Sequence, residues 1–430
     1  MPILLVAVIV FCCYRLAFFR LAELPDWVSP LLFLTKLLFG FVLWAVYTFY
    51  YTDRVNSDIY KFYDDAHYVH RSFFENKSAF IGLMTGSEDS SLDVYTGQMK
   101  NWERNFNKAV PFNENRFMIR LNALMMFVSG ENIHVHTIFF CFFSFIGCIL
   151  LLKIFQHFAS DGKKKWMLLT MLLPSFLFWT SGGLKESVII LGIGLMLYGF
   201  VFLRERLISS LFVFISGLII LFMTKYFLLI CLLPALVAYH LLNKKSSLQN
   251  IAAKYAGVLL LSIMVLVVVA PLSKTTDFAR IIAKKQKHAV AEAMYMKAGS
   301  YSEVPVVEDN LFSVIKAMPR GLWNTMLKPY AWQSRNPMMM LSAAENILIL
   351  LLIILAISYR DKAQKFDYNL LMFFSISLVI YFSVIGIMTP VLGNLVRYKV
   401  ILMPLLVFVL LYVMRTPRLQ KCNGQKGLMY

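Results

Sequence analysis

Residues Asn56 to His70 read NSDIYKFYDDAHYVH, which places three aspartates, two histidines and three tyrosines in fifteen positions. The stretch directly follows a long apolar run, and further apolar runs make up most of the chain after it. Ionisable groups this close to apolar helices are costly to keep there and often mark a functional site. The stretch is therefore the first place in this chain to look for chemistry.

The composition is that of an integral membrane protein. Of the 430 residues, 59% are hydrophobic and only 15% are charged, whereas soluble domains are about 45–50% apolar and about 25% charged. Several apolar runs reach the ~20 residues that a membrane-spanning helix needs. The runs are continuous rather than alternating, so helices are expected instead of a β-barrel.

The apolar runs predict an all-α polytopic membrane protein with about eleven transmembrane helices. We treat residues 1–430 as a single transmembrane domain with two long polar loops, 52–131 and 273–338. In the first loop, Arg116 to Phe127 is apolar on one face, which predicts a helix lying in the membrane interface. The predicted spans lie near residues 1–19, 28–51, 133–153, 166–180, 186–203, 208–223, 226–242, 252–272, 339–358, 367–388 and 396–414.

Basic residues predict the orientation. Eighteen lysines and arginines fall on one side of the predicted spans, whereas the short loops of the other side carry only Lys185, Lys225, Arg397 and Lys399. The positive-inside rule places the eighteen, and the C-terminus, in the cytoplasm and both long loops outside. The net charge of +18 is thus explained by topology, and nucleic acid is not expected as a partner. Five of the six cysteines lie in apolar runs and are expected to be buried small residues.

Three aspartates of the opening stretch are candidate catalytic residues: Asp64, Asp65 and Asp58. A carboxylate at the membrane surface can act as a general base or hold a metal ion. If the segment is helical, Asp58 and Asp65 can share a face, while His67 and Tyr68 lie three and four residues after Asp64. The alternative for any Asp pair is a solvated acidic loop.

Basic residues at the outer ends of other predicted helices are candidates for binding a substrate phosphate. They are Lys185 with its neighbour Glu186, Lys225, and Arg397 with its neighbour Tyr398. Arginine and lysine at one level would suit a lipid-linked phosphate or pyrophosphate. The alternative for a single lysine is snorkelling to the lipid headgroups. Arg320, in an aromatic and basic segment, is a further binding candidate, and we expect Arg397 or Lys185 to pair with Glu345.

These features resemble the GT-C class of membrane glycosyltransferases. The family has an acidic motif in an early outer loop, and Asp64-Asp65-Ala66-His67-Tyr68 is similar to it. An amphipathic juxtamembrane helix usually follows, as Arg116 to Phe127 does here, and Asn394 to Tyr398 followed by Pro404 is similar to the last outer turn of such enzymes. The segment from Pro174 to Ser187 is similar to membrane proteins of bacterial polysaccharide loci.

The resemblance implies a function on the extracytoplasmic face of a bacterial inner membrane. The donor would be a sugar linked to polyprenyl phosphate, and the acceptor a glycan, lipid or protein in cell-surface polysaccharide assembly. Asp64 or Asp65 would deprotonate the acceptor hydroxyl or hold a divalent metal ion, Mg or Mn. Lys185, Lys225 and Arg397 would stabilise the leaving lipid phosphate.

Two other functions use the same carrier lipid. A polysaccharide repeat-unit polymerase would depend more on loop arginines such as Arg320. A flippase or transporter of lipid-linked sugars would carry charges at helix midpoints and repeated halves. Lys36 is one such midpoint charge, but no repeat is evident in the sequence.

Overall fold

The computed structural model describes residues 1–51, 53–54, 57–87, 89–102, 114–242, 247–269, 277–334, 337–361 and 366–415. Within these ranges the chain is helical, and the extended pairing is limited to two isolated bridges. This agrees with the expected all-α class, because a backbone in lipid satisfies its hydrogen bonds best within a helix.

Six of the described helices are long and apolar enough to cross a membrane, or seven if the bent pair α16 (Leu392–Lys399) and α17 (Met403–Val413) counts as one span. The prediction of a polytopic membrane protein is therefore supported by the structure. The six spans are the helix α2 with its π-helical extension to Tyr50 (Val28–Tyr50), α7 (Ile133–Phe158), α10 (Leu207–His240), α11 (Leu248–Val268 of the helix Leu248–Val269), α14 (Pro337–Ser358) and α15 (Tyr368–Met388).

The remaining apolar helices are shorter. They are α1 (Pro2–Arg15), α8 (Pro174–Trp179), α9 (Lys185–Val201), α16 (Leu392–Lys399) and α17 (Met403–Val413). The predicted span near 166–180 is the 3-10 helix Lys164–Met171 followed by α8. Pro174 explains the break, since proline has no N–H for the preceding turn and fits the first position of a new helix.

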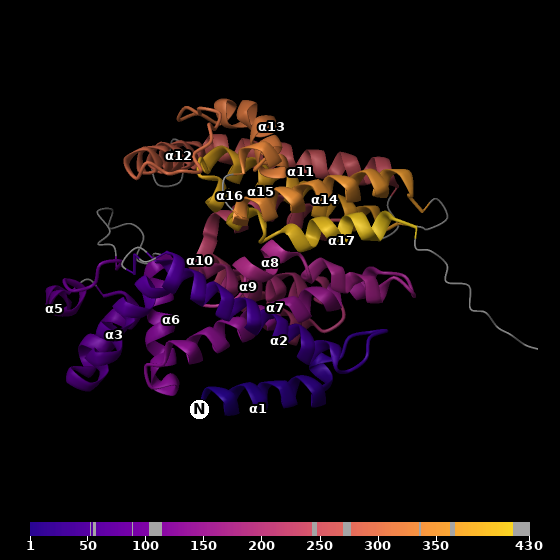
Figure 1. The fold of residues 1–430 in the computed structure, drawn as a ribbon. Helices are drawn as coiled ribbons and strands as arrows, with labels where there is room; N and C mark the ends of the chain where they lie inside the picture. The colour runs from indigo at the N-terminus through magenta and orange to yellow at the C-terminus, as the bar shows by residue number, and fades with distance from the viewer. Residues whose placement is uncertain are drawn as a thin grey trace, which may run out of the picture.

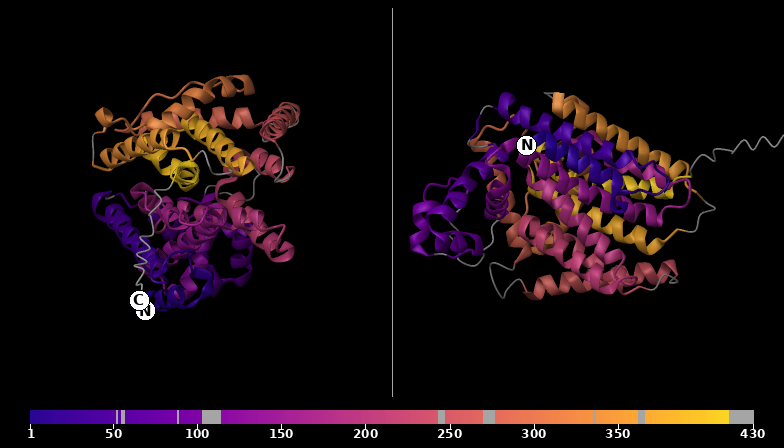
Figure 2. Two further views of the ribbon diagram at one scale, coloured as in Figure 1. Left: turned by 90° about the vertical axis from the view of Figure 1, so that its right-hand side faces the viewer. Right: turned by 90° about the horizontal axis from the view of Figure 1, so that it is seen from below.

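The helices form two layers (Figures 1 and 2). One contains α1, α2, α7 and α9, and the other contains α11, α14, α15 and α17. The helix α10 contacts α9 in the first layer and α15 in the second. Gly147 and Gly194 allow α7 and α9 to approach closely, because a Cβ on Gly194 would lie 2.6 Å from the Gly147 carbonyl oxygen. Small residues serve the same purpose in many membrane helix pairs.

The helix α10 is a hairpin of two shorter helices. A straight 34-residue helix would be about 51 Å long, yet Arg204, just before its start, donates a hydrogen bond to the carbonyl of His240 at its end (3.2 Å). The backbone departs from helical geometry at Lys225. The chain therefore reverses at Lys225, so the stretch Leu207–His240, counted above as one candidate span, consists of two arms that lie side by side.

The two predicted outer loops form helices of their own. The first contains α3 (Asp58–Glu75), α4 (Lys77–Thr85), α5 (Asp93–Thr96) and α6 (Glu114–Ser129), and the second contains α12 (Phe278–Tyr295) and α13 (Leu311–Leu327). A helix is present over Arg116 to Phe127 as part of α6, but Arg116 and Arg120 are buried against the carbonyls of Trp102 and Leu83 rather than set on an exposed polar face. Figure 1 shows α3, α5, α6 and α12 toward the same end of the layers.

Candidate functional site

Arg397 joins three distant parts of the chain at this end of the bundle. It lies near the end of α16 and is only 9% exposed. One Nη donates to the carboxylate of Asp58 in α3, and the other donates to Glu186 in α9 at 2.8 Å. The guanidinium also lies 5.9 Å from the centre of the Trp179 ring. A planar, forked donor such as arginine is suited to bridging two carboxylates in this way.

Asp58 is the aspartate of the opening stretch that faces this cluster. It is the first residue of α3, where the helix dipole favours a negative charge. It also binds Lys61, one turn later. Burial alone would raise the pKa of Asp58, but the charges of Arg397 and Lys61 outweigh it and lower the pKa below its usual range. Asp58 is therefore ionised at neutral pH.

Lys225 lies beside this ion pair because it is the turning residue of the α10 hairpin. Its Nζ is 3.6 Å from the centre of the Tyr398 ring, a cation–π contact with the residue next to Arg397. Lys225 is 5% exposed. Across the described ranges, no carboxylate lies within ion-pair distance of its Nζ.

Lys185, the first residue of α9, completes the group of predicted phosphate ligands. Its Nζ donates to Asn115 Oδ1 at 2.6 Å and to Glu114 Oε2 at 3.2 Å, both in α6. Burial would raise the pKa of Glu114, but the charges of Lys185, Lys285 and Lys225 outweigh that effect and lower it. Lys285 lies over the rings of Tyr226 and Phe227.

The cluster carries more positive than negative charge. Five cations are set against three carboxylates, a formal surplus of two positive charges. A local surplus of positive charge attracts anions. The cations are Lys61, Lys185, Lys225, Lys285 and Arg397, and the carboxylates are Asp58, Glu114 and Glu186.

The other two aspartates of the stretch bind elsewhere. Asp64 forms a forked ion pair with Arg54, and both side chains are well exposed. Asp65 accepts hydrogen bonds from the backbone N–H groups of Lys100 and Asn101, at 3.1 and 2.6 Å. Neither carboxylate contacts Arg397. The structure therefore assigns Asp65 a role in holding the loop, and Asp64 a place on the surface.

The remaining candidates also lie apart from Arg397. His67 contacts the Tyr63 carbonyl and lies 3.6 Å from Glu131, and Tyr68 packs on the apolar core between α3 and α6. Arg320 is exposed on α13. The predicted pairing of Glu345 with Arg397 or Lys185 is wrong. Glu345 instead accepts hydrogen bonds from the backbone N–H and the hydroxyl of Ser175, at 3.1 and 2.7 Å, at the start of α8.

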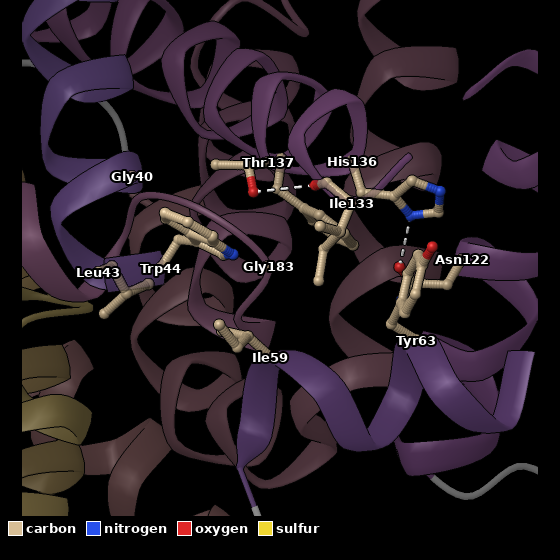
Figure 3. Close-up of a pocket in the computed structure, with 11 residues that line it drawn as sticks. Gly40, Leu43, Trp44, Ile59, Tyr63, Asn122, Ile133, His136, Thr137 and Gly183 are labelled. Carbon is tan, nitrogen blue, oxygen red and sulfur yellow. Dashed lines mark hydrogen bonds between the residues drawn. The ribbon is translucent and has the colours of Figure 1, made fainter. Parts of the chain in front are cut away.

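A small cavity lies beside the cluster (Figure 3). Ile59, next to Asp58, and Gly183, near Lys185, are among its lining residues. The indole N–H of Trp44, which also lines it, is buried and has no hydrogen-bond partner among the described residues. His136 on the opposite wall is fully engaged, by Ser129 and Asn122 (2.9 and 2.8 Å).

The site does not suit a divalent metal ion. Asp58 and Glu186 are the two carboxylates that come together, and the positive guanidinium of Arg397 already lies between them. In the part of the chain that the structure describes, no three His, Cys, Asp or Glu side chains are grouped to hold a metal. We therefore derive no step through one.

Four residues in or beside the cluster were not predicted from the sequence as binding residues: Lys61, Glu114, Trp179 and Lys285. Glu114 is 71 residues from Lys185, and its own neighbourhood in the sequence carries no sign of the contact. Trp179 could have been suspected, because it stands in the segment from Pro174 to Ser187. Comparisons with protein-family models, with curated proteins and with solved structures gave no match to this chain.

Proposed function

We propose that this chain is a membrane glycosyltransferase that moves a sugar from a polyprenyl-phosphate-linked donor to an acceptor on the extracytoplasmic face. The observation that supports it is the cluster around Arg397, where Asp58, Glu186 and Lys225 meet from three distant segments. Such a site offers an acid–base group and cations together. With both long loops outside, the cluster would stand at the outer membrane surface, where a lipid-linked donor is within reach.

Lys225 is the residue we propose as the first contact of the donor phosphate. The other main cations of the site, Arg397 and Lys185, are already bound to carboxylates, whereas Lys225 rests on an aromatic ring. Lys225 thus offers an Nζ that is not held in an ion pair, but the side chain is 5% exposed, so a phosphate must first displace the groups that cover it. The surplus positive charge of the cluster then favours the bound anion.

Asp58 is the residue we propose as the general base. It would accept the proton of the acceptor hydroxyl while the acceptor oxygen attacks the anomeric carbon. The bond between that carbon and the phosphate oxygen breaks, and its electron pair leaves with the lipid phosphate, which gains one negative charge. Lys225 and Arg397 would stabilise that charge as it develops.

Competition for Arg397 links donor binding to the chemistry. While Asp58 is bound to Arg397 its pKa is low, and a carboxylate of low pKa is a weak base. A phosphate that draws Arg397 toward itself would weaken this pair and raise the basicity of Asp58. The base would then be active only when the donor is present.

The phosphate-binding part of the proposal can be tested without knowing the sugar. Farnesyl phosphate, a short polyprenyl phosphate, is titrated against the purified chain in detergent, with farnesol as the control for the lipid tail. We expect Lys225→Met to weaken farnesyl phosphate binding by about tenfold, the loss of one charge-assisted contact. Arg320→Gln, at an exposed position outside the cluster, should bind it as the wild type does. Equal binding by Lys225→Met and wild type, or equal binding of farnesol, would contradict the proposal.

A further inference from the structure

A second cavity, of about 90 Å³, lies at the other end of the helix bundle. The helix α9 begins at Lys185 in the charged cluster, and Val201 at its end lines this cavity. Seventeen residues of helix separate the two ends by about 25 Å. The cavity is therefore distinct from the site described above, and it lies on the side that the basic residues predict to be cytoplasmic.

Three helices end at this cavity. Phe158, Val201 and His240 are the last residues of α7, α9 and α10, and all three are among its lining residues. The final carbonyl groups of a helix lack partners within it, and the C-terminal end carries partial negative charge. At the end of α10, Arg204 and Asn369 donate to the carbonyls of His240 and Tyr239. The first residues of α15 also line the cavity and bring the partial positive charge of a helix start. The helix ends therefore present both signs of partial charge to the cavity.

The charged side chains of the lining have both signs. Arg204 and Glu205 are exposed at the turn between α9 and α10, and Asp367 stands just before α15. Arg204 donates to the carbonyl of His240 at 3.2 Å, but across the described ranges no carboxylate forms an ion pair with it. Glu205 likewise has no cation within ion-pair distance in those ranges. Both charges can therefore contact a ligand.

The surroundings of the cavity are apolar and face outward. Phe158, Phe200 and Tyr239 contribute aromatic walls. Just beyond the lining, the side chains of Leu207, Ile208 and Leu241 are 65%, 86% and 59% exposed. An exposed aliphatic surface of this kind suits lipid chains, and it lies directly beside the lining of the cavity.

We propose that this cavity binds the headgroup of a zwitterionic phospholipid. The ammonium group would lie near the carboxylates of Glu205 and Asp367, and the phosphate would contact Arg204. A ligand that is only anionic would meet those two carboxylates, whereas a headgroup with both charges matches the lining. A cavity of about 90 Å³ favours the small primary ammonium of ethanolamine over the bulkier trimethylammonium of choline.

The test uses the full-length chain in detergent and three tritiated dioctanoyl lipids: phosphatidylethanolamine, phosphatidylcholine and phosphatidylglycerol. We expect phosphatidylethanolamine to bind about tenfold more tightly than phosphatidylglycerol, a difference of about 1.4 kcal/mol. Arg204→Gln and Glu205→Gln should each remove most of that difference. Both side chains are exposed, so neither substitution disturbs the core. Arg15→Gln and Asp161→Asn, exposed charges on the same predicted side, serve as matched controls.

Three outcomes would overturn the proposal. In the first, phosphatidylglycerol binds as tightly as phosphatidylethanolamine, which indicates a site for anions alone. In the second, Arg204→Gln and Glu205→Gln keep the wild-type preference. In the third, the control variants lose it to the same extent, which indicates a general charge effect. A preference for phosphatidylcholine over phosphatidylethanolamine would keep the zwitterionic site but contradict the argument from its volume.

Discussion

Arg397 bridges two carboxylates, of which Glu186 is buried and has no other cation within ion-pair distance among the described residues. Glu186 is 2% exposed and Arg397 is 9% exposed. Transferring such charges out of water is costly, and their attraction offsets that cost only while the geometry holds. The ion pairs also attach α3, which belongs to the first outer loop, to α9 and α16 in the bundle.

Replacing Arg397 should therefore destabilise the protein strongly. Arg397→Gln leaves the buried Glu186 without its cation, whereas Asp58 keeps Lys61. Removing one partner of a buried pair costs about 3–5 kcal/mol. The double variant Arg397→Gln with Glu186→Gln should recover part of this loss, because Glu186 is then no longer a buried charge without a cation. Thermal unfolding in detergent measures both. A melting temperature unchanged in Arg397→Gln would show that these pairs do not hold α3 in place.

The stability from Asp58 should depend on pH in a defined direction. Because its folded-state pKa is lowered, its contribution is complete above the ordinary aspartate pKa of about 3.9 and is lost as the pH falls below it. The difference in melting temperature between wild type and Asp58→Asn should thus be constant from pH 7 to pH 5 and shrink below pH 4. A difference that instead grows toward acid pH would mean that folding raises this pKa.

The sequence could locate the acidic stretch but could not decide among its aspartates. Asp64 and Asp65 form the conspicuous pair, yet neighbouring helical residues point in different directions. Asp58 is the residue that reaches Arg397, and that partner is 339 residues away in the chain. No residue near Asp58 in the sequence indicates this contact. Asp58 could be chosen over Asp64 and Asp65 only from the packing of α3 on the bundle.

At the scale of the elements, apolar runs predicted most helices because length and hydropathy decide what can lie in lipid. Breaks were harder to place. Proline at position 174 turns one predicted span into a 3-10 helix and the short helix α8. The reversal at Lys225, by contrast, could be predicted because a polar triplet, Thr224 to Tyr226, interrupts the apolar run.

The α10 hairpin can be verified by a distance. Spin labels at Leu207 and Leu241, both exposed, should lie less than about 25 Å apart, because the two ends of α10 meet at Arg204 and His240. A straight helix would separate them by about 51 Å. The measurement requires a background in which the native cysteines are replaced. A distribution centred near the longer distance would exclude the hairpin, and with it the position of Lys225 beside Tyr398.

At the scale of the whole molecule, α3 to α6 and α12 lie toward one end of the layers (Figure 1), which fits two loops on the same side of the membrane. Which side of the membrane these loops occupy is inferred from the distribution of lysine and arginine, which predicts that they lie outside the cytoplasm. We therefore expect single cysteines at Ser91 and Glu303, one exposed position in each loop, to react with an impermeant maleimide in intact cells. A cysteine at Asp161 should react only after permeabilisation. The background lacks Cys422, and the reverse labelling pattern would invert the topology.

If Asp58 is the general base at a site whose cations bind the donor phosphate, its loss should stop sugar transfer but not donor binding. Sugar transfer is measured in proteoliposomes supplied with tritiated polyprenyl-phosphate hexoses and a lipid extract as the source of acceptor. We predict that Asp58→Asn lowers transfer at least about 100-fold, the usual effect of losing a general base, while still binding farnesyl phosphate at least as tightly as wild type. Asp64→Asn, which affects only an exposed ion pair, should stay within about twofold of wild type. Loss of transfer in Asp64→Asn with full transfer in Asp58→Asn would contradict the account.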